Sequence, residues 1–281
     1  MHGPKILARS LSRATIKSSG SGNYWQYHSR SDRHSKMACW GILFDLVRES
    51  RSLRRHLEAG TVAFGVNHDM HDFKMNRKKN LDLVLCTPGN GGKTGRDFAE
   101  LIDKYGIDLD SEEARLLESL PPIVEAPVGM VRLALEAKAC MTEHVKALPR
   151  LHDELNSSHL TIHGSANHAI AVGFAMVNIA ETFVSSDLNK FDLSQYPVQI
   201  THHDQPRVTR RVLEKLRELP RRTKVAEEGF DAFGVVVVDC KNDGSPVTLW
   251  EDSPSPQAED IFHYKSMIRR AADLYDSRYG R

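Results

Sequence analysis

Long apolar runs are absent from this chain of 281 residues, and their absence limits what the protein can be. A membrane-spanning helix needs about 20 consecutive apolar residues. The longest apolar stretches, Ala169–Val177 and Gly234–Val238, are shorter than that. The first residues also lack the apolar segment of a secretory signal. We therefore expect a cytoplasmic protein that has no membrane partner.

Cysteine is scarce, since the chain has four and none stands in a C-x-x-C pair. Zinc sites and disulfide frameworks are recognised by close, regular cysteine spacing. Apolar neighbours surround each cysteine, so we expect free and buried thiols, with Cys86 and Cys140 as packing residues at strand ends. Histidine is abundant at 14, but no H-E-x-x-H motif is present. Zinc binding therefore stays an alternative that no motif supports.

Acidic residues are missing from residues 1–31, and the charge is unevenly distributed beyond them. Residues 1–80 hold 15 Lys/Arg against 6 Asp/Glu, a net charge of +9, whereas residues 81–120 hold 4 against 9, a net charge of −5. Residues 207–224 carry 8 Lys/Arg against 2 Asp/Glu, a net charge of +6. Basic regions of this kind favour polyanionic partners. We expect residues 1–31 to be a flexible basic arm and residues 32–281 to be one folded domain.

Hydrophobic periodicity predicts strands and helices in alternation through residues 32–281. The expected helices cover 35–58, 142–155, 208–219 and 258–279, and the expected strands cover 61–67, 80–86, 130–139, 230–239 and 247–250. The apolar stretch 169–179 is compatible with a strand or a helix. Two acidic helices are expected inside an insertion at about residues 89–124. This order predicts an α/β fold, with a mixed sheet flanked by helices.

One group of residues in the predicted strands suits metal-dependent chemistry. Residues i and i+2 of a strand face the same side, so Glu136 and Lys138 are expected to point together. Asp82, on another predicted strand, could join them. Magnesium prefers hard oxygen ligands and is often held by one or two carboxylates. A bound divalent ion activates water and neutralises a phosphate, and a lysine beside it can orient the attacking water.

Asp82 in LDLVLC, followed by Glu136-Ala137-Lys138 in VRLALEAKA, resembles the signature of the PD-(D/E)XK nuclease superfamily, which includes many restriction endonucleases. The resemblance covers about residues 35–180. It implies a restriction-endonuclease-like sheet and Mg²⁺-dependent DNA cleavage, with Asp82 and Glu136 as metal ligands and Lys138 at the water. In this family a carboxylate from the first helix often assists, and Asp45 or Glu49 could do so here.

The triplet (D/E)-x-K occurs three times, and its surroundings distinguish the copies. Asp72-Phe73-Lys74 lies in a polar, basic segment, and Asp239-Cys240-Lys241 leads into a predicted hairpin turn. Only Glu136-Ala137-Lys138 ends a buried type of strand and precedes a helix. The sequence departs from the family pattern in two respects: Asn80-Leu81 stand where the family has a proline before Asp82, and the gap from Asp82 to Glu136 is longer than in most members.

The resemblance implies an enzyme that cuts double-stranded DNA, a type II restriction-type or other defence nuclease, with a homodimer as a plausible assembly. Five basic residues are expected to hold the nucleic acid: Lys78, Lys79, Arg207, Arg210 and Arg211. Two alternatives remain open. One is a non-catalytic nucleic-acid-binding module. The other is a nucleotide-binding loop around Lys93, which lies in a Gly-Lys-Thr sequence after a predicted strand.

Overall fold

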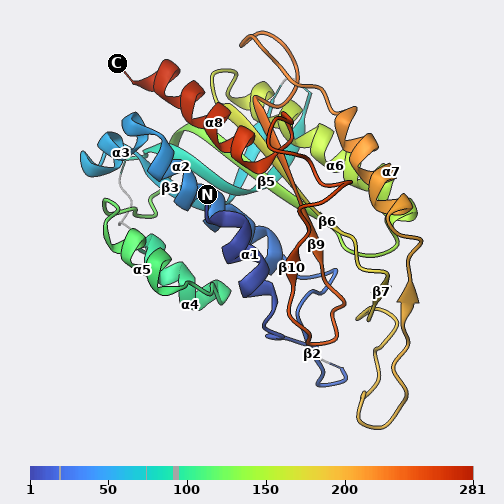
Figure 1. The fold of residues 1–281 in the computed structure, drawn as a ribbon. Coiled ribbons are helices and arrows are strands. Elements are labelled where there is room, and N and C mark those ends of the chain that lie inside the picture. Colours follow the sequence, from blue (N-terminus) through green and yellow to red (C-terminus); the bar gives the residue numbers. More distant parts are fainter. Residues whose placement is uncertain (19, 74, 91–94, 281) are drawn as a thin grey trace.

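A six-stranded mixed sheet forms the centre of the molecule in the computed structural model of this chain (Figure 1). The structure describes residues 1–18, 20–73, 75–90 and 95–280. The strand order is β10-β9-β6-β5-β4-β3. Strands β3, β4 and β5 form an antiparallel meander, β6 and β9 run parallel to β5, and β10 is antiparallel to β9. The predicted α/β class with a mixed sheet flanked by helices is confirmed.

The sheet strands are β3 (Ala63–Asp72), β4 (Arg77–Pro88), β5 (Val128–Cys140), β6 (Ile170–Asn178), β9 (Ala232–Asp239) and β10 (Thr248–Leu249). Two short ladders pair β1 (Ile16–Lys17) with β2 (Tyr24–Trp25) and β7 (Thr182–Phe183) with β8 (Thr201–His202). The helices are α1 (Gly3–Leu11), α2 (Arg33–Glu49), α3 (Arg51–Glu58), η1 (Phe98–Glu100), α4 (Leu101–Tyr105), α5 (Ser111–Glu118), α6 (His144–Ser165), α7 (Arg207–Arg217) and α8 (Tyr264–Tyr279). The stretch 169–179, which periodicity left open, is therefore a strand.

Helices cover both faces of the sheet, and each face has its own apolar core. Helices α1, α2 and α8 contribute to one core, whereas α6 and α7 contribute to the other (Figure 1). Strand β6 is buried along its whole length because it is central and covered on both sides. Helix α6 connects β5 to its parallel neighbour β6, since parallel strands need a long crossover.

The predicted helix over residues 35–58 is two helices, α2 and α3, separated at Ser50. The Ser50 backbone is extended, with φ −91° and ψ 115°. Its hydroxyl accepts a hydrogen bond from the Leu53 amide at 3.1 Å and so caps the N-terminus of α3. Hydrophobic spacing alone did not reveal the break, because Leu46 and Leu53 are buried in the same core.

The sequence predicted a flexible basic arm over residues 1–31. The structure differs, because residues 3–11 form helix α1, which packs into the core. Ile6, Leu7 and Leu11 are at most 1% exposed, and α1 packs against α2. The carboxylate of Asp45 on α2 accepts hydrogen bonds from the backbone amides of residues 2 and 3 at 2.8–3.0 Å. The apolar side of α1 therefore stabilises the fold by burial.

The arginines of this N-terminal segment pair with the acidic insertion. Arg9 forms ion pairs with Glu113 and Asp110, and Arg13 lies 3.0 Å from Asp108. Part of the positive charge of the first residues and part of the negative charge of residues 81–120 are thus paired with each other. Arg9 and Arg13 are consequently engaged with the protein's own carboxylates.

The insertion between β4 and β5 is helical, as predicted, and contains η1, α4 and α5. Asp97 and Asp110 begin its helices with reciprocal hydrogen bonds to Glu100 and Glu113, a capping box at each start. Lys93, the residue of the nucleotide-loop alternative, lies outside the described residues. Among the helices that the structure describes, none is long and apolar enough to cross a membrane.

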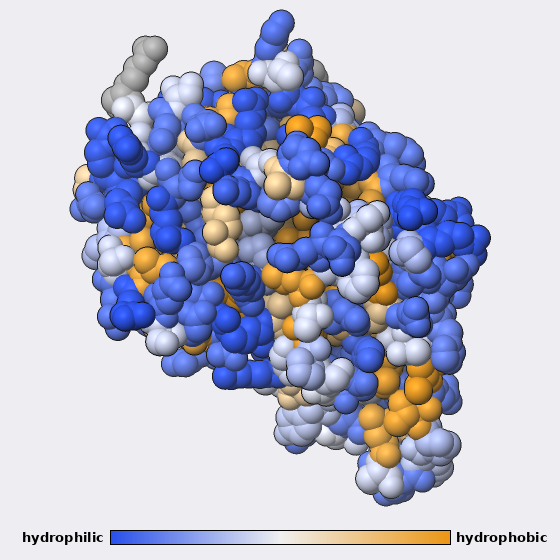
Figure 2. All heavy atoms as spheres, in the orientation of Figure 1, coloured by the Kyte–Doolittle hydropathy of each residue, from blue (hydrophilic) through white to orange (hydrophobic). Residues whose placement is uncertain are grey.

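A long loop between β7 and β8 projects from the body of the molecule (Figure 1). It exposes large apolar side chains: Leu188, Tyr196, Val198 and Ile200. Figure 2 shows apolar colour gathered on this projection, whereas most of the visible surface is hydrophilic. The projection is therefore the part of this face where apolar side chains are most plainly exposed to solvent.

Candidate active site

The sheet divides between β4 and β5 at the residues that the sequence singled out. In the described part of the chain, the two strands pair from Leu83 opposite Leu135 to Pro88 opposite Val128. On the other side of the Leu83–Leu135 pair, the first residues of β4 pair with β3 alone, and the last residues of β5 pair with β6 alone. Asp82 is the first residue on the unpaired side. The division leaves backbone groups of β5 available to side chains.

Asp82 occupies this division and is held from both sides. Its Oδ2 accepts a hydrogen bond from the Ala137 amide at 3.0 Å, so the side chain takes the place of the missing strand partner. Its Oδ1 accepts hydrogen bonds from Lys36 Nζ at 2.8 Å and Ser35 Oγ at 3.0 Å, both from the first turn of α2. The carboxylate is consequently fixed between β5 and α2.

Glu136 and Lys138 project from β5 together, as the i, i+2 spacing predicted. Lys138 Nζ lies 2.8 Å from Glu136 Oε1 and 3.6 Å from Oε2 of Glu154 on α6. Glu136 is only 1% exposed, and Oε1 is paired with Lys138, whereas Oε2 accepts no hydrogen bond within the described part of the chain. Buried polar atoms are hydrogen-bonded in the great majority of cases. This carboxylate therefore retains unused acceptor capacity inside the protein.

The two carboxylates differ in their pKa. Burial raises the pKa of Glu136, and the negative charge of Asp82 raises it further. Burial also acts to raise the pKa of Asp82, but its ion pair with Lys36 outweighs this and the pKa lies below the ordinary value. The arrangement favours an ionised Asp82 beside a Glu136 that resists ionisation until positive charge approaches it.

Three lysines surround these acids, and sequence reasoning missed Lys36. Lys36 is 3% exposed, and Lys79 donates a hydrogen bond from Nζ to the backbone oxygen of Glu154 at 3.0 Å. Burial lowers the pKa of Lys79. One signal in the sequence could have revealed Lys36. It lies at the start of an apolar helix, three residues before Cys39, and a lysine buried there needs a charged partner.

An open cleft of about 510 Å³ leads to this group. It lies between the segment before α2, the end of β5 and one side of α6. Asp82 and Lys138 line it, together with His34, Arg150 and Glu154. Burial lowers the pKa of His34 to about 4, so this ring is neutral at pH 7. Solvent and a ligand can thus reach Lys138 and the edge of Asp82.

The two carboxylates suggested from the first helix are engaged away from the cleft. Asp45 lies nine residues beyond Lys36, about 14 Å along the helix axis. Besides the N-terminal amides it accepts a hydrogen bond from Tyr264 Oη at 3.0 Å. Glu49 is partly exposed and lies 3.7 Å from Arg269. The structure therefore brings Ser35 and Lys36, rather than these acids, from α2 to the site.

The residues expected to hold nucleic acid fall into two groups. Lys79 belongs to the cluster, whereas its neighbour Lys78 is exposed on β4. Arg207, Arg210 and Arg211 are exposed on α7, which packs against α6. Arg207 pairs with Asp204. The structure consequently joins one of the five to the candidate site.

The sequence led to predictions for the cysteines and for the groups that could bind a metal ion, and the structure describes each of them. All four cysteines are free and buried, as predicted, and Cys86 and Cys140 are packing residues in the core. Across residues 1–18, 20–73, 75–90 and 95–280, no group of three or more His, Cys, Asp or Glu side chains is arranged to hold a metal ion. The candidate site itself offers two carboxylates, from Asp82 and Glu136.

Comparison with known proteins finds no family model, no curated protein and no solved structure that matches this chain.

Proposed function

We propose that the protein is a Mg²⁺-dependent endonuclease of the restriction-endonuclease-like class, with Asp82, Glu136 and Lys138 as its active site. The observation that carries the proposal is the buried Glu136 carboxylate, whose Oε1 is paired with Lys138 while its Oε2 accepts no hydrogen bond within the described residues, with Asp82 beside it. Leaving a buried acceptor unsatisfied costs about 1–3 kcal/mol, so a ligand that binds there gains that interaction.

The order of elements supports the same proposal. Helix α2, strands β3, β4 and β5, helix α6 and strand β6 follow one another in the order that the resemblance implies. Asp82 and the Glu136–Lys138 pair lie on adjacent strands, so the three residues meet although the helical insertion separates them in the sequence. The proposal thus rests on topology and on the chemistry of one small group of side chains.

The donor set suits Mg²⁺, because both acids offer hard oxygens and Oε2 of Glu136 accepts no hydrogen bond within the described residues. Asp82 and Glu136 would hold the ion, which supplies charge neutralisation at the phosphate and a more acidic water. Lys36 and the Ala137 amide keep Asp82 in one orientation. Lys138 lines the cleft beside these acids, where it can hold the attacking water or a phosphate oxygen.

The substrate that fits is double-stranded DNA, because the cleft is open and basic residues lie both in it and on α7. We further propose a restriction-type or other defence role in the cytoplasm. A homodimer would supply a second active site for the second strand. The exposed apolar projection between β7 and β8 offers a surface for self-association, which sedimentation of the purified protein would test.

Plasmid cleavage is the direct test. Supercoiled plasmid is incubated with the protein in Mg²⁺ or EDTA, beside Glu136→Gln and Lys138→Ala. We expect Mg²⁺-dependent cleavage that falls by at least about 100-fold in either variant, the usual scale for loss of a residue in acid–base catalysis. Glu49→Gln is the matched control, since Glu49 lies outside the site, and it should cut like the wild type. Cleavage that survives both active-site substitutions would contradict the proposal.

A non-catalytic nucleic-acid-binding module is the second candidate. Each carboxylate already lies 2.8 Å from a lysine, Asp82 from Lys36 and Glu136 from Lys138. Such pairs could be a structural ion network, which also shifts pKa values. DNA binding that is insensitive to Mg²⁺, with no cleavage of plasmid under any condition, would favour this second function.

A further inference from the structure

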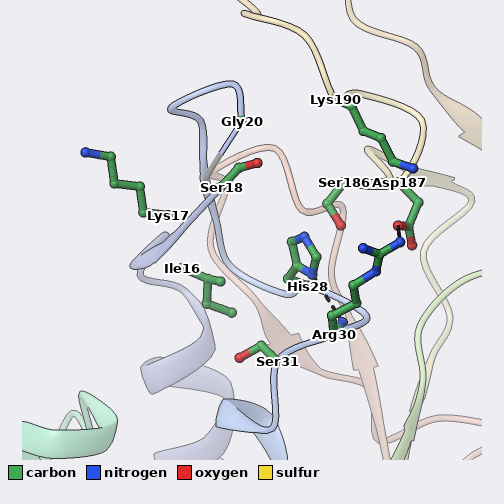
Figure 3. A pocket seen from close by; sticks show the side chains of 10 residues that line it. All are labelled: Ile16, Lys17, Ser18, Gly20, His28, Arg30, Ser31, Ser186, Asp187 and Lys190. Atoms are coloured by element: carbon green, nitrogen blue, oxygen red, sulfur yellow. Dashed lines mark hydrogen bonds and ion pairs between the residues drawn. The ribbon is translucent and has the colours of Figure 1, made fainter.

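A second hollow, here named the basic pocket, adjoins the cleft. It has a volume of about 450 Å³ and lies between the β1–β2 segment and residues 186–190 (Figure 3). Its lining includes three cationic side chains, Lys17, Arg30 and Lys190, against one carboxylate, Asp187. Ser31 and Ser186 add hydroxyl groups. This combination of cations and hydroxyl donors suits an anion that accepts several hydrogen bonds.

The arginine of the basic pocket is oriented by its surroundings. Arg30 Nη2 lies 4.0 Å from Asp187, and Asp187 also accepts a hydrogen bond from Ser29 Oγ at 2.6 Å. The backbone amide of Arg30 donates to His28 Nδ1 at 3.1 Å. In Figure 3 the side chains of Arg30 and Lys190 converge near Asp187, whereas Lys17 points away from them. The pocket thus directs two cations toward one place.

Lys190 is the less restrained of these two cations. It is exposed, and it makes no ion pair within the part of the chain that the structure describes. Asp187 alone cannot neutralise both Arg30 and Lys190. An anion between them would therefore complete the local charge balance, with Arg30 able to donate two parallel hydrogen bonds.

The basic pocket and the cleft are continuous, because Arg30, Ser31 and Asp187 line both. The cleft contains Asp82 and Lys138. We propose that the basic pocket holds a backbone phosphate of the same DNA whose scissile phosphate lies at Lys138. This inference rests on the proposed function and adds the path of the substrate to it. Contacts of this kind position a duplex without reading its sequence.

Binding of a labelled 20-base-pair duplex in EDTA tests the pocket without cleavage. The double variant Arg30→Ala/Lys190→Ala should bind about tenfold more weakly at 100 mM salt. The slope of log Kd against log salt should fall by about one, as expected for one lost phosphate contact. The charge-matched control is Lys265→Ala/Arg270→Ala, two exposed positions on α8. An unchanged slope in the pocket variant would overturn the proposal.

The outcomes separate this inference from the proposed function. Plasmid cleavage by the wild type with an unchanged salt slope in the pocket variant would retain the nuclease and reject the pocket. A reduced slope without any Mg²⁺-dependent cleavage would retain the pocket and reject the nuclease. Titration with inorganic phosphate adds a further arm. If the wild type binds phosphate tightly, the pocket variant does not, and both bind the duplex equally, the pocket serves a free anion and the proposal fails.

Discussion

Two buried carboxylates on the central sheet, Asp231 and Glu136, have opposite surroundings. Asp231 Oδ2 accepts a hydrogen bond from the Ala171 amide at 2.8 Å and lies 3.0 Å from Arg222, and Arg278 donates to Oδ1 at 2.6 Å. Glu136 has Lys138 at 2.8 Å from Oε1 and no hydrogen bond to Oε2 within the described residues. Asp231 is therefore saturated, whereas Glu136 is not.

The difference separates a structural charge cluster from a candidate functional one. Asp231 joins the start of β9 to β6 and to the end of α8, and Arg222 also donates to backbone oxygens of residues 167, 169 and 225. Asp231 lines neither the cleft nor the basic pocket. Glu136 lies behind the cleft, beside Asp82 and Lys138, which line it. Burial of a charged group is thus compatible with a structural or a functional role, and the number of hydrogen bonds that the group accepts distinguishes the two roles.

The largest expected effect comes from breaking the saturated cluster with Asp231→Asn. Arg222 is 2% exposed and would lose its carboxylate partner, which leaves an uncompensated buried cation. Removal of one partner from a buried ion pair costs about 3–5 kcal/mol. Urea unfolding followed by circular dichroism should report a loss of free energy of unfolding of about this size. A loss below about 1 kcal/mol would show that the cluster is not structural.

A second prediction concerns acid, and it sharpens the structural side of the comparison. Burial lowers the pKa of His144, His159 and His163 on α6 to about 4, and His163 lies 3.7 Å from Asp231. In the unfolded chain a histidine has a pKa of about 6.5. As pH falls below about 6.5, protons therefore bind to the unfolded chain before the folded one, and stability is lost until about pH 4.

Together with His34, whose pKa burial also lowers to about 4, these rings should lower the free energy of unfolding by on the order of 5 kcal/mol between pH 7 and pH 5.5. Urea unfolding at both pH values measures this difference. The variant His163→Asn should show about three quarters of it, because one of these four titrating groups is removed. Equal stability of the wild type at the two pH values would contradict the burial argument.

Much of the site could be predicted because it depends on local alternation. Glu136 and Lys138 face one side of β5 since they are two residues apart, and Asp82 lies on the neighbouring strand. The division between β4 and β5 could not be predicted, since it depends on where two strands cease to pair. The approach of Lys36 to Asp82 joins residues 46 positions apart, and periodicity contains no information about such a partner.

The N-terminal segment illustrates the same limit for charge. Residues 1–31 contain cations without acids, which indicated a free arm. The partner of Arg9 is Glu113, 104 positions away in the insertion, and the neutralisation appears only when α1 packs in the core. Local composition described the charge correctly but not its partner. The apolar residues Ile6, Leu7 and Leu11 were the signal that α1 is buried.

The smallest expected effect is the change in the free energy of unfolding caused by Glu136→Gln. This variant makes the same acid-to-amide change as Asp231→Asn, but at the carboxylate with an unused oxygen. Because burial and Asp82 raise the pKa of Glu136, ionisation of this group at pH 7 opposes folding, and a neutral amide removes that cost. Lys138 loses its closest counter-charge, but it is 27% exposed and keeps Glu154 at 3.6 Å. Because the amide removes the cost of a buried negative charge and Lys138 stays partly solvated, we expect a change within about 1 kcal/mol. Urea unfolding beside Asp231→Asn measures it. A loss of 3 kcal/mol or more would place Glu136 with Asp231 as a structural group and would remove the ground for treating its Oε2 as a ligand site.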